Sequence, residues 1–274
     1  MPTSNAPLLQ INDATVLKKQ QAVLDHISLR IQQGEHTAII GPNGSGKSSL
    51  IKLITYQHYP LAHGDGTPVV QVFGREHWNV FELRTQLGLV SADLHQSFVG
   101  GSSFRDVTGF DAVLSGFFAS QGILHRDEVT PRMRQQAEQA ITLVDGAHLA
   151  AKSMEEMSTG EVRRMLIARA LVTDPPALLL DEPTTGLDIV TRQRFLQTVE
   201  RLTTQGKTIL LVTHHLEEII PAIQRVILLQ HGRIVGDGTK AEMLTDERLS
   251  NLFEIPLHVQ AQADYYSVTL GANL

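Results

Sequence analysis

The sequence predicts an α/β fold whose central sheet is mostly parallel. Three short runs are apolar almost throughout, which is typical of strands covered on both faces; they are Ala38–Ile40, Ala177–Leu180 and Ile209–Thr213. Segments of helical pattern separate these runs, as expected when strands of one sheet lie parallel. The first run leads directly into a glycine-rich loop at residues 41–46.

The chain before the first buried run predicts antiparallel β structure. Residues Ile27–Ile31 alternate apolar and polar side chains, as in a half-exposed strand, and Gly34 follows as a turn residue. We therefore expect an N-terminal antiparallel β part beside the parallel sheet. Immediately after the glycine-rich loop, residues Ser48–Ile54 read as a helix.

A stretch of different character, residues 91–157, predicts an inserted α-helical subdomain. One helix is indicated by apolar residues at spacings of three and four, namely Val107, Phe110, Val113, Leu114, Phe117 and Phe118. A second helix is expected to begin with Thr130 as its N-cap and Pro131 at its first position, and to end near Gly146.

The C-terminal segment predicts a β-hairpin. Leu257–Val259 and Tyr266–Val268 alternate apolar and polar residues on either side of Gln262–Asp264. With this segment the chain divides into four parts: a core with the glycine-rich loop at 1–90, the helical insertion at 91–157, a second part of the core at 158–240, and the hairpin segment at 241–274.

Composition excludes several classes of protein. The 274 residues are 42% hydrophobic and 19% charged, which is ordinary for a globular chain, and the net charge of −6 argues against nucleic-acid binding through bulk electrostatics. The absence of cysteine rules out disulfides and cysteine zinc sites and fits a reducing cytosol. No apolar run approaches the roughly 18 residues that span a bilayer, and the first residues do not read as a secretory signal. We therefore expect a soluble, cytoplasmic chain that only a partner could hold at a membrane.

The glycine-rich loop and the residues after it match the phosphate loop of P-loop nucleotide-binding proteins, GxxxxGK[ST]. Its glycines allow a tight turn that points backbone N–H groups at phosphates, and the following helix adds its positive N-terminal end. Lys47 carries a charge for the outer phosphates, and the Ser48 hydroxyl can bind Mg²⁺. A glycine-rich turn without a ligand is the alternative, but the position between a buried strand and a helix weighs against it. The predicted binding residues are Gly41, Pro42, Asn43, Gly44, Ser45, Gly46, Lys47, Ser48 and Ser49.

Polar residues follow the two later buried runs, where parallel strands deliver side chains to one edge of a sheet. Asp181 is expected to hold Mg²⁺, and Glu182, one residue on, to polarise the attacking water. Ordinary solvated acids in a loop are the alternative for this pair. His214 follows the last run and would reach the γ-phosphate, although a lone histidine is often structural and the pair with His215 could equally be a chance metal contact. Ser158 with Glu161 has the spacing of a helix capping box.

The motifs in order resemble the ATP-binding cassette (ABC) ATPases. These motifs are GPNGSGKS, MSTGEVRRMLIARAL, PPALLLDEPTTGLD and LLVTHH, and the resemblance covers roughly residues 7–240. MSTGE stands where the family's signature LSGGQ is usual. The resemblance extends to single-cassette subunits of molybdate- or iron-type uptake systems.

This resemblance implies a head-to-tail dimer that holds ATP and Mg²⁺ between two copies of the chain. Ser158, Thr159, Gly160 and Glu161 would contact the nucleotide bound by the second copy, and Asp188 would cross the dimer interface. Glu182 would be the catalytic base and His214 the switch histidine that contacts the γ-phosphate. A separate transmembrane permease would dock on the insertion, particularly residues 98–118, and the chain would touch neither cargo nor nucleic acid.

Two departures from the family pattern concern the nucleotide site. The usual glutamine after the strand Leu87–Ser91 is replaced by Ala92, so Asp93, Gln96 or a water would have to take its place. The aromatic residue that usually stacks on adenine is absent from Thr15–Lys19, so the base would rest on an aliphatic side chain or the stem of Lys18.

The functions compatible with these motifs differ in class. The first is the ATPase subunit of an ABC transporter, an importer in our reading. The second is a soluble ABC ATPase in an assembly process such as iron–sulfur cluster biogenesis, which co-purification with a membrane protein would separate from the first. The third, a regulatory switch that binds nucleotide without hydrolysing it, is disfavoured by the presence of Glu182 and His214.

Overall fold

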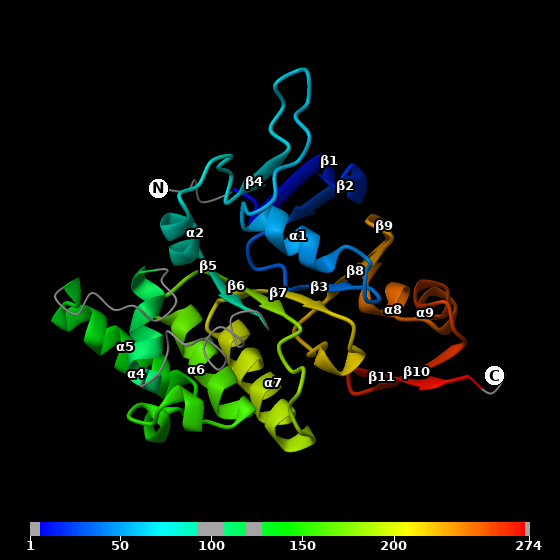
Figure 1. Ribbon diagram of the computed structural model, residues 1–274. Coiled ribbons are helices and arrows are strands. Elements are labelled where there is room, and N and C mark those ends of the chain that lie inside the picture. Colours follow the sequence, from blue (N-terminus) through cyan, green and yellow to red (C-terminus); the bar gives the residue numbers. More distant parts are fainter. Residues whose placement is uncertain (1–5, 92–106, 119–127, 272–274) are drawn as a thin grey trace. The chain divides into compact units, whose positions relative to one another are not determined.

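The computed structural model describes residues 6–91, 107–118 and 128–271 (Figure 1). The chain forms two compact units. The first unit contains Met1–Trp78 and Thr208–Leu274, and the second contains Asn79–Lys207.

The first unit contains the predicted N-terminal antiparallel sheet. Strand β1 (Leu9–Lys18) pairs with β2 (Gln21–Ile31) on one side and with β4 (Val70–Val72) on the other. The turn between β1 and β2 has positive φ at both central residues, 50° at Lys19 and 67° at Gln20. Such a two-residue turn matches the right-handed twist of the strands that it joins, which is why the hairpin closes here.

The same unit holds four further strands, three of which are mutually parallel. Strand β3 (Thr37–Ile40) lies between β7 (Thr208–Thr213) and β8 (Arg225–Gln230), parallel to both, and β9 (Arg233–Thr239) runs antiparallel beside β8. Every residue of β3 and β7 is buried, which confirms two of the predicted apolar strands. Helix α1 (Lys47–Ile54) follows β3.

The C-terminal part of the first unit confirms the predicted hairpin. After the short helices α8 (Lys240–Met243) and α9 (Asp246–Phe253), β10 (Leu257–Gln262) pairs antiparallel with β11 (Tyr265–Leu270). Their turn again has two residues of positive φ, 47° at Ala263 and 66° at Asp264. The Asp246 carboxylate ties α9 to β10 by accepting the backbone N–H of Val259 at 2.7 Å.

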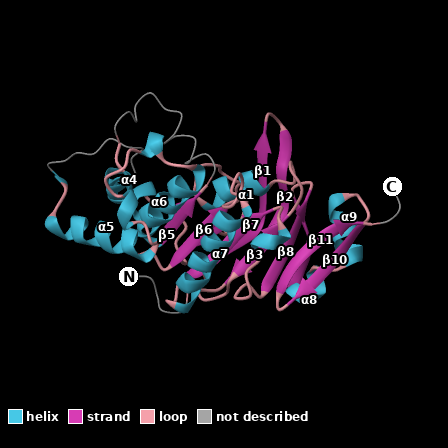
Figure 2. Cartoon of the chain, turned by 90° about the horizontal axis from the view of Figure 1, so that it is seen from below, coloured by secondary structure: helices cyan, strands magenta, loops and turns pink. Residues whose placement is uncertain are grey.

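The second unit is mainly helical and contains one parallel pair of strands. Strand β5 (Leu87–Val90) pairs with β6 (Ala177–Asp181), and Figure 2 shows α4, α5 and α6 gathered beside β5. The helices are α2 (Val80–Gln86), α4 (Gly109–Leu114), α5 (Pro131–Leu143), α6 (Thr159–Leu171) and α7 (Ile189–Thr204).

The helices expected in the insertion are present with one difference. Helix α5 begins as predicted, with the Thr130 hydroxyl accepting the N–H of Met133 at 3.2 Å and Pro131 at the first position. The earlier helix begins at Gly109, so Val107 lies outside it. The Thr108 hydroxyl caps the N–H of Asp111 at 3.1 Å, and this cap sets the start of the helix two residues after the apolar pattern begins. From Ser115 to Phe118 the helix tightens to 3₁₀ geometry.

None of the helices in the described part of the chain is both long enough and apolar enough to span a bilayer.

Candidate nucleotide-binding site

The phosphate loop connects β3 to α1 in the first unit, and its backbone accepts only glycine at the first position. A Cβ atom on Gly41 would lie 2.2 Å from the carbonyl oxygen of Leu229 and 2.5 Å from Oγ of Ser45. Gly44 and Gly46 have φ of 82° and 108°, a region that side chains rarely adopt. The loop therefore curls in the way that turns successive N–H groups toward one point.

Helix α1 differs from the other described α-helices at its N-terminus. Seven helices (α2 and α4 to α9) have a side-chain oxygen that caps their first N–H groups, whereas α1, which starts after Gly46, has no side-chain cap. The first N–H groups of a helix have no intrahelical partner and favour an anion. In addition, Oγ of Ser45 is buried without a hydrogen-bond partner among the described residues. Both features fit a phosphate group in the loop.

Lys47 is the buried cation of this loop. Its side chain is 5% exposed, and its ammonium group donates to the carbonyl oxygens of Gly41 (2.8 Å) and Pro42 (3.0 Å). Next to it, Ser48 is exposed at the second position of α1. A hydroxyl so placed fits a Mg²⁺ ion bound to the phosphates, because Mg²⁺ takes oxygen ligands.

His214 lies at the same edge of the first unit as the phosphate loop. In the parallel pair of β3 and β7, Ile40 lies opposite Thr213, so the phosphate loop and His214 leave neighbouring strand ends. The His214 ring contacts that of His215 with centroids 4.0 Å apart. Within the described residues no group of three or more metal-binding side chains is present, so the histidine pair has no such metal-binding neighbours.

The acidic pair lies at the end of β6 in the second unit. Val90 of β5 is opposite Leu180 of β6, so Ser91 and Asp181 occupy equivalent places at the ends of two parallel strands. Glu182 then turns the chain with a φ of 44°, an uncommon value for a residue with a side chain. Such backbone conformations cluster at functional sites. Ala92, Asp93 and Gln96, which concern the missing glutamine, lie outside the described residues.

The signature segment forms the N-terminus of α6, and its capping box is present. The Ser158 hydroxyl accepts the N–H of Glu161 at 3.3 Å, while the Glu161 carboxylate accepts the N–H of Ser158 at 2.7 Å and pairs with Lys152 at 2.9 Å. These contacts lower the pKa of Glu161, first through the backbone N–H of Ser158 and then through Lys152. The carboxylate that the sequence assigned to nucleotide contact therefore already holds the start of α6 in place.

Asp188 caps the next helix and lies beside the signature. Its carboxylate accepts the N–H of Thr191 at 2.9 Å and the hydroxyl of Thr191 at 2.7 Å, and these bonds lower the pKa of Asp188. A Cβ atom on Gly160 would lie only 2.3 Å from Cγ2 of Thr191, so the starts of α6 and α7 are in close contact.

Sequence reasoning missed Thr191 and Lys152. Thr191 stands three residues after Asp188, the spacing of an N-cap bond, and that spacing could have identified it. For Lys152, nine residues before Glu161, the sequence offers no comparable signal. The expected adenine contact is also unusual: Leu17 on β1 is 49% exposed and Lys18 is exposed, and neither side chain is aromatic.

A phosphate loop with an uncapped helix, placed at the ends of parallel strands, defines the chain as a P-loop nucleotide-binding protein of the α/β class. Comparison with known protein families identifies the family within this class. The sequence profile described as ABC transporter matches residues 24–185. The chain belongs to this family, as an ATP-binding subunit that hydrolyses ATP, and the family resemblance in the motifs is confirmed.

Individual relatives agree over nearly the whole chain. An ABC transporter ATP-binding protein of Bacillus subtilis, YlmA, is 36% identical over 257 residues, which are 92% of this chain and 93% of the relative. The hemin import ATP-binding protein HmuV of Hahella chejuensis is 28% identical over 88% of this chain and 90% of its own length. A solved metal-chelate type ABC transporter in an inward-facing conformation contains a chain with a TM-score of 0.76 at 24% identity, covering 98% of this chain and 97% of that chain. At this identity the structural likeness shows the fold.

Proposed function

We propose that this ATPase drives import through a separate transmembrane permease, as a head-to-tail pair of copies. Each pair would hold two ATP molecules, bound by the phosphate loop of one copy and by Ser158–Glu161 of the other. The observation that carries the nucleotide part is the phosphate loop itself, where Lys47 is buried and α1 is the described α-helix without a side-chain cap.

Exposed apolar side chains beside Asp188 support the second copy as a partner. Ile189 and Val190 directly follow Asp188 and are 79% and 59% exposed. When a protein surface covers large apolar side chains at such exposure, the free energy of the system falls. Contact through residues 188–190 would bring the signature segment, which lies against Thr191, to the partner's nucleotide.

In hydrolysis, each predicted side chain has a role that its chemistry supports. Lys47 and the first N–H groups of α1 would hold the outer phosphates. Ser48 and Asp181 are the residues that would hold Mg²⁺, which would supply positive charge for the phosphates. Glu182 would orient the attacking water as a general base. His214 would contact the γ-phosphate from the neighbouring strand end.

The similarity to a hemin import protein supports import as the proposed direction. The proposed location of the ATPase is the cytoplasm, at the inner face of the membrane. The test is purification of the tagged chain from detergent-solubilised membranes of its source cells. We expect a permease in a fixed ratio to two copies of this chain. In inside-out reconstituted vesicles, whose ATPase faces the bath, added ATP should release preloaded substrate from the lumen, which is the direction of import. An ATPase recovered entirely without membrane proteins would favour the assembly function instead.

A further inference from the structure

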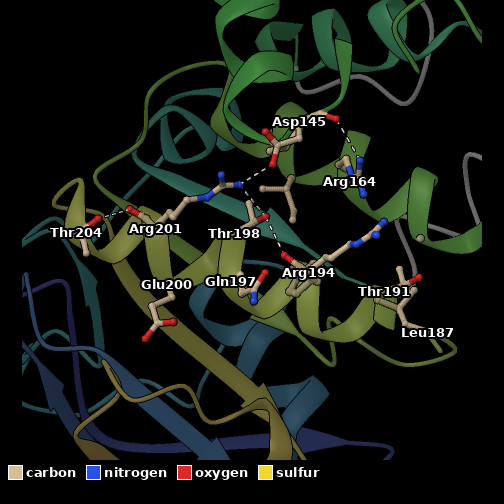
Figure 3. A pocket seen from close by; sticks show the side chains of 14 residues that line it. Asp145, Arg164, Leu187, Thr191, Arg194, Gln197, Thr198, Glu200, Arg201 and Thr204 are labelled. Carbon is tan, nitrogen blue, oxygen red and sulfur yellow. Dashed lines mark hydrogen bonds and ion pairs between the residues drawn. The ribbon is translucent and has the colours of Figure 1, made fainter. Parts of the chain in front are cut away.

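A cavity of about 630 Å³ lies between α6 and α7 in the second unit (Figure 3). It starts beside Gly160 and Thr191 and continues along both helices to the end of α5 at Val144 and Asp145. Volumes of this size are typical of small-molecule sites. The predicted nucleotide contacts use only the Gly160 end, so the remainder of the cavity has no role in the function proposed above.

The floor of the cavity is apolar. Ile167, Leu187 and Phe195 line it and are 2%, 8% and 7% exposed. Phe195 offers an aromatic ring, and aromatic rings bind flat organic groups well. A ligand that only carried charge would leave this floor unused.

Three arginines line the cavity, and one of them is neutralised. Arg201 forms an ion pair with Asp145 at 2.9 Å and bonds to the Thr198 hydroxyl at 3.3 Å. Arg164 donates instead to the uncharged backbone carbonyl of Asp145 at 3.1 Å. Within the described residues the guanidinium group of Arg194 donates no hydrogen bond to another side chain, and the backbone carbonyl of Arg194 accepts the Thr198 hydroxyl at 3.0 Å.

Arg164 and Arg194 face the same part of the cavity. Arg164 lies one helical turn beyond Gly160, and Arg194 one turn beyond Thr191, so both project from the helix faces that line it. Figure 3 shows the two guanidinium groups extending toward the same space, while Glu200 points away from them. Arg164 is half-buried and Arg194 is exposed. Two like charges that line one cavity repel each other, and an anion between them removes that repulsion. Guanidinium groups also match phosphate geometry with paired hydrogen bonds.

We propose that this cavity binds a small organic phosphate of about mononucleotide size. Its phosphate lies between Arg164 and Arg194, and its flat or apolar body rests on Ile167, Leu187 and Phe195. Occupation would hold α6 and α7 at a fixed spacing and so act on the neighbouring signature segment.

The test uses the full chain with Lys47→Ala, which weakens binding at the phosphate loop. The probes are inorganic phosphate and AMP. Isothermal titration should show both ligands binding, AMP about tenfold or more tightly than phosphate, because only AMP reaches the floor. Arg194→Ala should weaken both by about tenfold or more, the usual effect of losing a charge-assisted bond. The matched control is Arg134→Ala on α5, an exposed arginine that does not line the cavity.

Three outcomes would overturn the proposal. They are the absence of binding by either probe at millimolar concentration, equal affinity in the Arg194→Ala protein, and equal losses in the Arg194→Ala and Arg134→Ala proteins. Equal affinity for phosphate and AMP would overturn the role of the apolar floor. Because Lys47→Ala is present throughout, failure here leaves ATP binding by the phosphate loop untouched, and ATP binding is measured separately in the unmodified protein.

Discussion

The Lys47 ammonium group lies 2.8 Å from the carbonyl oxygen of Gly41, six residues earlier in the chain, and folds back over the phosphate loop. A buried ammonium group needs such partners, because burying an unpaired charge is costly. When phosphates occupy the loop, the same group can exchange a carbonyl for a phosphate oxygen without leaving its position. The loop is therefore organised for its ligand before the ligand arrives.

Lys47→Ala should reduce ATP affinity by on the order of 100-fold, the loss expected when strong charge-assisted bonds to phosphate are removed. Titration with a fluorescent ATP analogue measures it. Lys52→Ala, in the last turn of the same helix, is the matched control and should leave affinity within about twofold. Affinity like that of the unmodified protein in Lys47→Ala would disprove the phosphate-loop assignment.

Glu182→Gln should preserve ATP binding while slowing hydrolysis by about 10²- to 10⁴-fold, because the amide cannot accept a proton from water. The trapped ATP should then produce a dimer, visible as an ATP-dependent shift in size-exclusion chromatography. Glu138→Gln, an exposed acid on α5, is the control and should hydrolyse normally. If Glu182→Gln retains normal turnover, another group supplies the base.

Local sequence patterns were sufficient to predict most of the helices and strands named in the sequence analysis. Buried apolar runs identified β3, β6 and β7, and the residues Thr130 and Pro131 placed the start of α5, because these signals act within a few residues. The start of α4 was misplaced, since the Thr108 cap competes with the apolar spacing that includes Val107. The predicted hairpin at the C-terminus is present, although only its two residues of positive φ show the type of turn.

The candidate site follows from the sequence where one motif carries it, and less so where distant residues meet. The phosphate loop follows from eight consecutive residues. By contrast, the contact of Gly160 with Thr191 and the ion pair of Lys152 with Glu161 depend on packing between segments that sequence spacing does not encode. The arginine-lined cavity belongs to the same class, because Arg164 and Arg194 come from different helices.

The position of Lys18 predicts weak selection of the nucleotide base. Lys18 ends β1 opposite Gln21, and β2 lies against the loop, since a Cβ on Gly46 would be 3.0 Å from the Val23 carbonyl oxygen. Without an aromatic side chain in Thr15–Lys19, ATP and GTP should bind within about threefold of each other. Lys18→Tyr should tighten ATP by about fivefold or more, since stacking of a base on an aromatic ring contributes about 1–3 kcal/mol.

Equilibrium titrations with both nucleotides measure this selectivity, and Lys19→Tyr, on the turn, is the control. A preference for ATP above about tenfold in the unmodified protein would show that another group recognises the base.

The capping box of α6 predicts a pH dependence of stability. The pKa of Glu161 is lowered in the folded protein by the N–H of Ser158 and by Lys152. A carboxyl whose folded pKa is below its unfolded value stabilises the fold above the unfolded pKa, and this contribution is lost as the pH falls through the folded pKa. Glu161→Gln should therefore cost about 1 kcal/mol at pH 7 and progressively less below about pH 4.5.

Urea unfolding of both proteins between pH 3.5 and 7 measures this difference. The control is Glu155→Gln, at an exposed acid before α6. Its unfolding free energy should differ from that of the unmodified protein by an amount that does not shrink at low pH. A constant difference across this pH range would exclude the ionised capping box as its source.

The contact between Gly160 and Thr191 predicts a rescue experiment. In Gly160→Ala, the new methyl group would meet Cγ2 of Thr191 at 2.3 Å, and Thr191 cannot easily rotate away because its hydroxyl bonds to Asp188 at 2.7 Å. We expect a loss of about 1–3 kcal/mol in unfolding free energy, as for other overpacked sites, and loss of ATP-dependent dimerisation in the Glu182→Gln background. Adding Thr191→Ser removes Cγ2 but keeps the hydroxyl, so stability should return. Dimerisation should return as well if it depends on the position of the signature segment against Thr191. Unfolding curves and size-exclusion chromatography measure the two effects, and Gly160→Ala without either loss would show that the starts of α6 and α7 separate freely.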